Sequence, residues 1–178
     1  MTKRNNLVFI GLQIIGWIIF VGLCIEAGAL IVNFVLSLFN PEVVHNLYQK
    51  LDLSQIYNTN IWVYFGMYGF ILTISISKAY LFYVVIMLLH KLDLEKPFNT
   101  YVADQFKKIS YITLEIGIIS LIAREISQSM VHYGLEPGTL DKFWEDGSAF
   151  LLMAAVVYVL ATIFSRGVEI QNENDLTV

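Results

Sequence analysis

The chain has 178 residues, of which 57% are hydrophobic and only 15% are charged, and its net charge is −4. Soluble domains are about one-quarter charged, so this composition argues against a soluble enzyme, and its hydrophobicity excludes a disordered chain. The acidic balance offers no basic surface for nucleic acid, and the single cysteine excludes an internal disulfide and a zinc site made of cysteines. The composition therefore predicts a helical membrane protein.

Four apolar stretches are long enough to cross a membrane as helices, which requires about 20 residues. They cover residues 7–39, 61–89, 109–131 and 148–164, and a tail, 165–178, follows them. The third stretch is the most polar, but as a soluble helix it would have nothing soluble to pack against. The predicted fold class is therefore all-α: an integral membrane four-helix bundle in which residues 1–178 form a single domain.

Lysine and arginine residues set the orientation, because loops on the cytoplasmic side carry more of them. Seven of the eleven lie before the first stretch, between the second and third, or after the fourth. Lys50 and Lys142 lie on the other side. Both the N and C termini and the loop 91–108 are therefore expected in the cytoplasm, while 40–60 and 132–147 are expected outside.

The connecting segments carry further signals. Pro41 ends the first helix, and the external segment after it, Glu42 to Leu53, has the apolar spacing of a short amphipathic helix on the membrane surface. In the cytoplasmic loop, either Asn99 or Thr100 is suited to cap a helix that runs on into the third stretch. The N-terminus imitates a secretory signal, but its apolar run is too long for one, so we expect an uncleaved helix with a buried Cys24.

Five ionisable residues fall inside the predicted membrane helices, where a charge is costly and suggests a function. They are Glu26, Lys78, Glu115, Arg124 and Glu125. At about 1.5 Å per residue from the cytoplasmic end, Glu26 lies at about 29 Å and Arg124 at about 23 Å, an outer level. Lys78 lies at about 17 Å and Glu115 at about 9 Å, an inner level that a lysine side chain reaches by snorkelling. The charged residues of each level could form an ion pair. Such a pair could fix the register of the helices, respond to an ion, proton or small ligand, or line a transport path.

Chemistry of other kinds has little support in the sequence. It contains no glycine-rich phosphate loop, no HExxH motif and no Gly-x-Ser-x-Gly motif. His45 and His132 lie in different external loops and are not expected to bind a metal together. We therefore expect a non-enzymatic protein with no catalytic, cofactor-binding or metal-binding residues.

Two motifs on the cytoplasmic side are distinctive. Lys96-Pro97-Phe98 precedes a lysine-bearing helix, and the fourth stretch ends in Arg166-Gly167 before an acidic tail that closes on Glu-Asn-Asp-Leu-Thr-Val. With these motifs and its four apolar stretches, nearly the whole chain resembles a family of small bacterial integral membrane proteins, domain of unknown function 2975. Ser165 stands where that family usually has a basic residue. The resemblance implies the bacterial cytoplasmic (inner) membrane, no established activity, and a gene often placed beside a small helix-turn-helix regulator.

The predicted function is a regulatory or sensory membrane subunit that holds or releases such a cytoplasmic regulator. Candidate partner-binding residues are Lys107 and Lys108 in the cytoplasmic loop and Glu169, Glu173 and Asp175 in the tail. The protein is expected to contact the lipid bilayer and no nucleic acid directly, and its copies could associate as a homo-oligomer. Two alternatives remain open: a small ion channel or transporter that uses the buried charges, and a structural or assembly factor.

Overall fold

The computed structural model describes residues 3–92, 97–132 and 140–175, and over these the regular structure is helical apart from one isolated bridge between Leu47 and Leu51. The four long helices are α1 (Lys3–Phe39), α3 (Ile61–Lys91), α4 (Thr100–His132) and α5 (Gly147–Asp175). The short elements between them are the 3-10 helices η1 (Pro41–His45), η2 (Tyr48–Lys50) and η3 (Leu140–Phe143) and the α-helix α2 (Ser54–Thr59). The all-α prediction is confirmed, and each predicted apolar stretch is helical. The last three residues of the tail lie outside the described residues.

Asparagine side chains begin several of these helices. The Oδ1 atom of Asn60 accepts a hydrogen bond from the backbone N–H of Trp62 at 3.0 Å, at the start of α3. At the start of α4, Asn99 Oδ1 accepts one from the backbone N–H of Val102 at 2.9 Å. Such caps satisfy backbone donors that have no partner inside the helix. Asn99 rather than Thr100 therefore caps α4, which runs on without a break into the third apolar stretch, as predicted.

The long helices differ in their suitability for a bilayer. Among the described residues, three helical segments are long and apolar enough to cross a membrane: 8–39, 61–91 and 140–174. Helix α4 is equally long, but it is not one of them, because charged residues recur along it. The prediction of four membrane spans is therefore supported for three of them.

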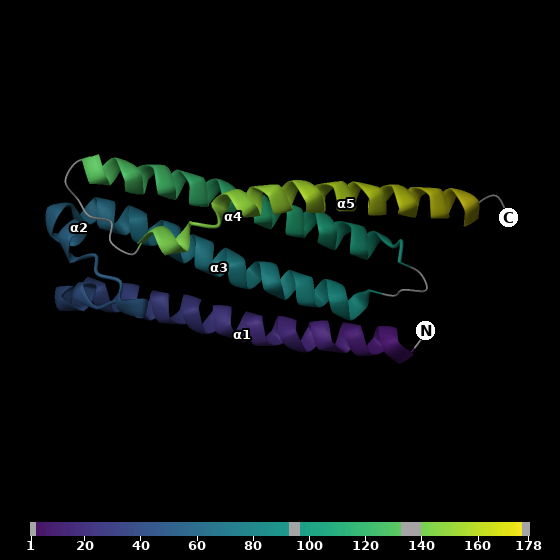
Figure 1. Ribbon diagram of the computed structural model, residues 1–178, viewed down its shortest axis with the longest axis horizontal. Coiled ribbons are helices and arrows are strands. Elements are labelled where there is room, and N and C mark those ends of the chain that lie inside the picture. The colour runs from purple at the N-terminus through teal and green to yellow at the C-terminus, as the bar shows by residue number, and fades with distance from the viewer. Residues whose placement is uncertain (1–2, 93–96, 133–139, 176–178) are drawn as a thin grey trace.

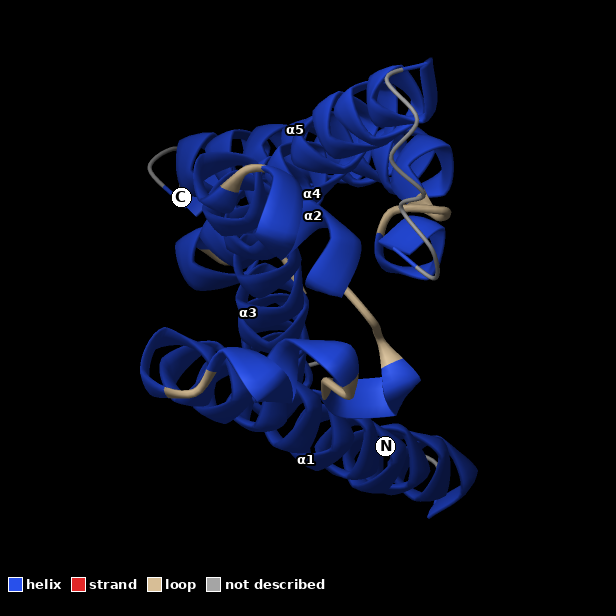
Figure 2. Cartoon of the chain, turned by 90° about the vertical axis from the view of Figure 1, so that its left-hand side faces the viewer, coloured by secondary structure: helices blue, strands red, loops and turns tan. Residues whose placement is uncertain are grey.

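The four long helices lie side by side in alternating directions, so the N- and C-terminal ends of the chain lie at the same end of the molecule (Figure 1). We call this the inner end, and the opposite end, which holds η1, η2, α2 and η3, the outer end. Helix α3 packs against α1 and against α4, and α5 packs along α4. Within the described residues, the backbone of α1 approaches neither α4 nor α5. The four long helices of the predicted bundle form an open row, with α3 between α1 and the α4–α5 pair (Figure 2).

Helix α1 is held along one narrow face only. Gly16 lets it approach α3, since an added Cβ there would lie 3.1 Å from Ile86 Cγ1, and Gln13 Nε2 donates to the Leu89 carbonyl at 3.3 Å. In the most apolar 18-residue stretch of α1, only 6% of the residues are buried inside the protein. Cys24 is exposed, so the prediction of a buried thiol was wrong. The uncovered apolar faces of α1 suit contact with lipid.

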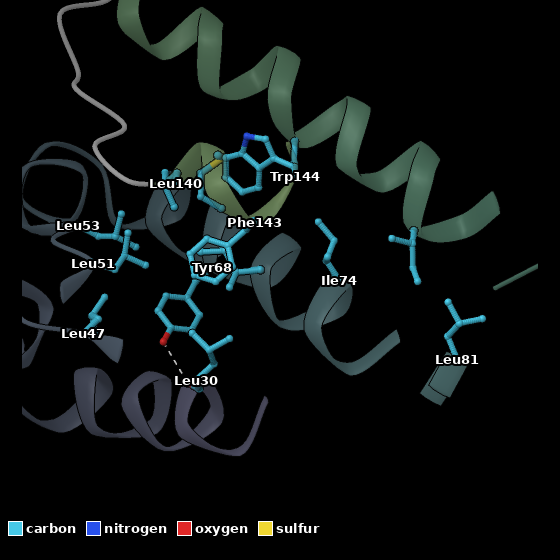
Figure 3. Packing of buried hydrophobic residues seen from close by; sticks show 14 of the residues in the cluster. Leu30, Leu47, Leu51, Leu53, Tyr68, Ile74, Leu81, Leu140, Phe143 and Trp144 are labelled. Carbon is cyan, nitrogen blue, oxygen red and sulfur yellow. Dashed lines mark hydrogen bonds between the residues drawn. The ribbon is translucent and has the colours of Figure 1, made fainter. Parts of the chain in front are cut away.

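At the outer end the core is built from the connecting segments (Figure 3). The predicted amphipathic helix over Glu42 to Leu53 is instead two 3-10 turns, folded back at the Leu47–Leu51 bridge and at Lys50, whose φ is 59°. The chain turns here because its apolar side chains point into the protein rather than into lipid. The buried residues are Val44, Leu47, Leu51 and Leu53 from this segment and Ile56 from α2, with Leu140, Phe143 and Trp144 from η3 and the residue after it.

Helices α4 and α5 approach each other most closely through small residues. An added Cβ on Gly117 would lie 2.7 Å from Leu151 Cδ2, and one on Gly147 would lie 2.8 Å from Ser120 Cβ. Ser110 Oγ donates a hydrogen bond across the seam to the Ala154 carbonyl at 3.1 Å. Helices in a membrane associate through such close backbone contact, because lipid supplies no hydrophobic drive between them. The α4–α5 seam therefore depends on the absence of a side chain at two positions.

We predict that Gly117→Val destabilises the protein, because the new side chain overlaps Leu151 and forces α4 and α5 apart. Overpacking of this kind costs ~1–3 kcal/mol. Gly66→Val is the matched control, since an added Cβ at Gly66 meets nothing within 4 Å and both changes place a β-branched residue in a helix. The measurement is thermal unfolding in detergent, and equal melting temperatures for the two variants would contradict this role of the seam.

Candidate functional site

Lys78 and Glu115 lie at the same level, on α3 and α4. The contact that shows this is made by their neighbour, since Ser77 Oγ donates to Glu115 Oε1 at 3.4 Å. Among the described residues no ion pair joins Lys78 to Glu115, and the Lys78 ammonium lies 5.4 Å from the centre of the Phe150 ring. Adjacent residues on a helix point about 100° apart, so only one of Ser77 and Lys78 can face Glu115. The structure therefore brings Lys78 and Glu115 to one level, but it gives Glu115 the neighbouring Ser77 as its partner in place of Lys78.

Glu26 and Arg124 do not meet. Glu26 is half-buried on α1, which does not approach α4 within the described residues, so the predicted outer pair is corrected. Arg124 instead lines a cavity of about 290 Å³ at the outer end, with Gln128 on its own helix and the acidic residues Asp141 and Glu145. Glu125, next to it, is exposed and does not line this cavity.

Asp141 fixes the floor of this outer cavity. Its Oδ1 accepts a hydrogen bond from Trp144 Nε1 at 3.2 Å and another from Ser127 Oγ at 3.5 Å. The Ser127 bond joins η3 to α4, the Trp144 bond closes the turn after η3, and Asp141 lines the cavity with Arg124. The external segment 132–147 contains four acidic residues, but the sequence gives no signal that Asp141 is anchored between two elements.

The external histidines, His45 and His132, were considered as metal ligands in the sequence analysis. Within the described part of the chain, no three His, Cys, Asp or Glu side chains come together as metal ligands. His45 Nδ1 lies 3.9 Å from Asp52 Oδ1. Hydrogen bonds from the Ser54 side chain and backbone hold the pKa of the Asp52 carboxyl below its usual range, with a smaller contribution from His45. The Asp52 carboxylate therefore stabilises the start of α2, where it accepts a hydrogen bond from the Ser54 backbone N–H at 2.9 Å.

At the inner end, the two distinctive motifs of the sequence touch each other. Phe98 packs directly over Gly167, where an added Cβ would overlap the ring. The Phe98 ring also lies 5.4 Å from that of Phe164, centre to centre, and Phe106 lies 4.8 Å from Phe164. The loop before α4 is thus clamped against the last third of α5.

This clamp lies beside a helical tail. The tail was predicted as an extension beyond the membrane helix with no structure assigned, but α5 continues through it to Asp175. Arg166 Nη1 forms an ion pair with Glu169 Oε2 at 2.8 Å, one turn later on the exposed surface. Glu173 is exposed, and Asp175 is the last residue of the helix, with its side chain outside the described part. The acidic candidates therefore lie along one rigid helix.

A polar cavity of about 420 Å³ lies between α4 and α5 at this end. Of the predicted partner-binding residues, Lys107 and Glu169 line it together with Arg166, while Lys108 is exposed elsewhere on α4. Sequence reasoning missed its hydroxyl groups, which come from Tyr111 on α4 and from Tyr158, Thr162 and Ser165 on α5. On α5, the lining residues Tyr158, Thr162, Ser165 and Glu169 follow one another at intervals of four, three and four residues. That spacing is the signal that could have revealed a polar stripe on an apolar helix.

The match to a known family covers residues 40–178, from the end of α1 onward. This includes the contact between Phe98 and Gly167 and the whole of the α4–α5 seam. The chain belongs to DUF2975, a family of proteins of unknown function. The resemblance inferred from the two motifs is thereby confirmed, although α1 lies outside the matched region. No curated protein matches this DUF2975 chain, and no solved structure matches it.

We predict that the effect of Gly167→Ala on stability depends on whether Phe98 is present. In an otherwise unchanged chain it should be neutral or destabilising, because the methyl group displaces the Phe98 ring. In a Phe98→Ala chain it should stabilise by ~0.5–1 kcal/mol, since alanine is the better helix former. Thermal unfolding of the four variants forms a double-mutant cycle. Additive effects would show that the two motifs do not interact.

Proposed function

We propose that this protein is a non-enzymatic regulatory or sensory subunit of the bacterial cytoplasmic membrane, which holds a small helix-turn-helix regulator at its inner end. The observation that supports this proposal is the continuation of α5 beyond its apolar part, as a helix fixed by Phe98 against Gly167. A free tail would lose more conformational entropy on binding than a helix that is already ordered. The resemblance to the family supplies the kind of partner.

The charges of this helix suit a basic partner. Glu169 and Glu173 are exposed on it, and the C-terminal end of any helix carries additional partial negative charge. A helix-turn-helix protein has a basic surface that binds phosphates, and an acidic helix can compete for that surface. Each exposed contact contributes ~1 kcal/mol or less, so binding should be sensitive to salt and should rely on the local concentration that the membrane provides.

A channel or transporter built from several copies is the second candidate. The observation that favours it is a stripe of exposed charged positions along α4, which begins in the cytoplasmic loop and continues to membrane depth at Glu115 and Glu125. The stripe contains Asp104, Lys108, Glu115 and Glu125. Charged groups in a membrane face the interior of a bundle or a water-filled path. In a single chain this stripe faces outward, so it would line such a path only between copies.

The orientation of the protein can be tested by cysteine labelling. In a Cys24→Ser background, Asn58→Cys marks the outer end and Asn172→Cys marks the inner end, and both positions are exposed. We expect an impermeant thiol reagent added to intact cells to label position 58 and to spare position 172 until the cells are opened. The reverse pattern would place the acidic helix outside the cell and exclude a cytoplasmic regulator as its partner.

The regulatory proposal predicts that charge reversal on α5 releases the regulator. Glu173→Lys, or deletion of residues 171–178, should reduce recovery of the neighbouring regulator with the purified membrane protein at low salt. High salt should reduce recovery with the unchanged protein as well. Glu42→Lys is the control, because it reverses an exposed carboxylate at the opposite end. Equal recovery under all conditions, or none under any, would reject the proposal in favour of the channel or transporter.

A further inference from the structure

Two hollows lie end to end along the α4–α5 seam. The first is the polar cavity of about 420 Å³ at the inner end. The second, of about 240 Å³, lies next to it toward the middle of the helices and is lined by Leu114 on α4 and by Leu151 and Ala155 on α5. Tyr111 and Tyr158 line both hollows, so the two are neighbours on one surface. The seam therefore offers a polar site that leads into an apolar groove.

The polar cavity has the chemistry of an anion site. Lys107 and Arg166 supply two positive charges against one negative charge from Glu169. Arginine and lysine together donate several hydrogen bonds of the kind that phosphate oxygens accept. The Arg166–Glu169 pair does not close the cavity, because both side chains are mostly exposed, at 76% and 57%, and such pairs are weak. An arriving anion can therefore share or take over the guanidinium.

Ser165 gives an independent indication. It lines the polar cavity, and its Oγ is buried without a hydrogen-bond partner, the one such side-chain atom within the described part of the chain. A buried hydroxyl that lacks a partner costs about 1–3 kcal/mol. Water does not reach this atom in the rotamer shown, so rotation of the Ser165 side chain toward the cavity, where a ligand oxygen could accept its hydrogen bond, would relieve that cost. The hydroxyl of Thr162 is already used, since it donates to the Tyr158 carbonyl at 3.0 Å.

The direction of the seam distinguishes a lipid from a free anion. From Glu169 to Leu151 the seam extends 18 residues along α5, about 27 Å, with its polar part at the helix terminus and its apolar part toward the centre. A phospholipid in a leaflet has the same order, with the headgroup outward and the acyl chains inward. A free phosphate would leave the apolar groove empty. Alanines at positions 154, 155 and 161 on α5 have short side chains, so they leave room in the seam for a chain to lie.

We propose that the α4–α5 seam binds one phospholipid with an anionic headgroup, from the leaflet at the inner end. Arg166 and Lys107 hold the phosphate, joined by the Ser165 hydroxyl once its side chain rotates toward the cavity, and one acyl chain lies along Leu114, Leu151 and Ala155. The net positive charge of the cavity selects an anionic headgroup over a zwitterionic one. Glu169 competes with the lipid for Arg166.

The test is a titration of the purified full-length protein in detergent with phosphatidylglycerol, followed by native mass spectrometry. Parallel arms use phosphatidylcholine and inorganic phosphate. We expect one phosphatidylglycerol to bind saturably and more tightly than phosphatidylcholine, and inorganic phosphate to bind more weakly than either. Lys107→Gln and Arg166→Gln should each weaken binding by about tenfold. Lys108→Gln, which removes the same charge outside the cavity, should change it little.

Two further variants separate the proposal from loss of folding and from a site for free phosphate. Glu169→Gln should tighten phosphatidylglycerol binding, a gain that misfolding cannot produce. Ala155→Leu should fill the apolar groove and weaken lipid binding, while Val156→Leu beside it should not. Equal effects of Lys107→Gln and Lys108→Gln, or equal binding of the two lipids, would overturn the proposal. The proposal would also be overturned if inorganic phosphate bound tightly and Ala155→Leu changed neither phosphate binding nor lipid binding. The assay contains no regulator, so its outcome is independent of the proposed regulatory role.

Discussion

The close contact of α4 with α5 at Gly117 and Gly147 is the constraint on which the rest of the structure depends. Helix α4 carries charges along its length and is the least suited of the long helices to contact lipid. It is held in place because the absence of side chains at these two glycines lets its backbone approach α5 closely. The same contact fixes the inner end of α5, so that Gly167 comes to lie under Phe98.

The central position of α3 explains how the charged groups are accommodated. Because α1 packs on one side of α3 and α4 on the other, charges on α1 and α4 are kept apart. Each polar group finds a local partner instead: Glu115 accepts from Ser77, Lys78 lies over Phe150, and Arg124 faces acidic residues beside η3. The open row of helices thus replaces long-range ion pairs with short contacts between neighbouring elements.

The two ends of the molecule differ in their chemistry. The outer end is a packed apolar core closed by short helical turns, with a cavity beside Arg124. The inner end combines a clamped loop, a rigid acidic helix and a cavity lined by Lys107 and Arg166. Groups that can recognise a partner or a lipid headgroup are therefore concentrated at the end that carries both termini.

The sequence by itself determined the helices and their levels. Long apolar runs without proline define α1, α3 and α5, Asn99 or Thr100 marks the start of α4, and counting residues assigned Lys78 and Glu115 to one inner level. Only the tertiary structure decided which helices touch, because nearly any apolar helix face can contact lipid or another helix, and a choice rests on a few small residues such as Gly117. Glu26 was therefore paired with Arg124 in error. The helical tail and the polar cavity also come from tertiary contacts, since Phe98 and Gly167 are 69 positions apart in the sequence and meet only after α4 and α5 have packed.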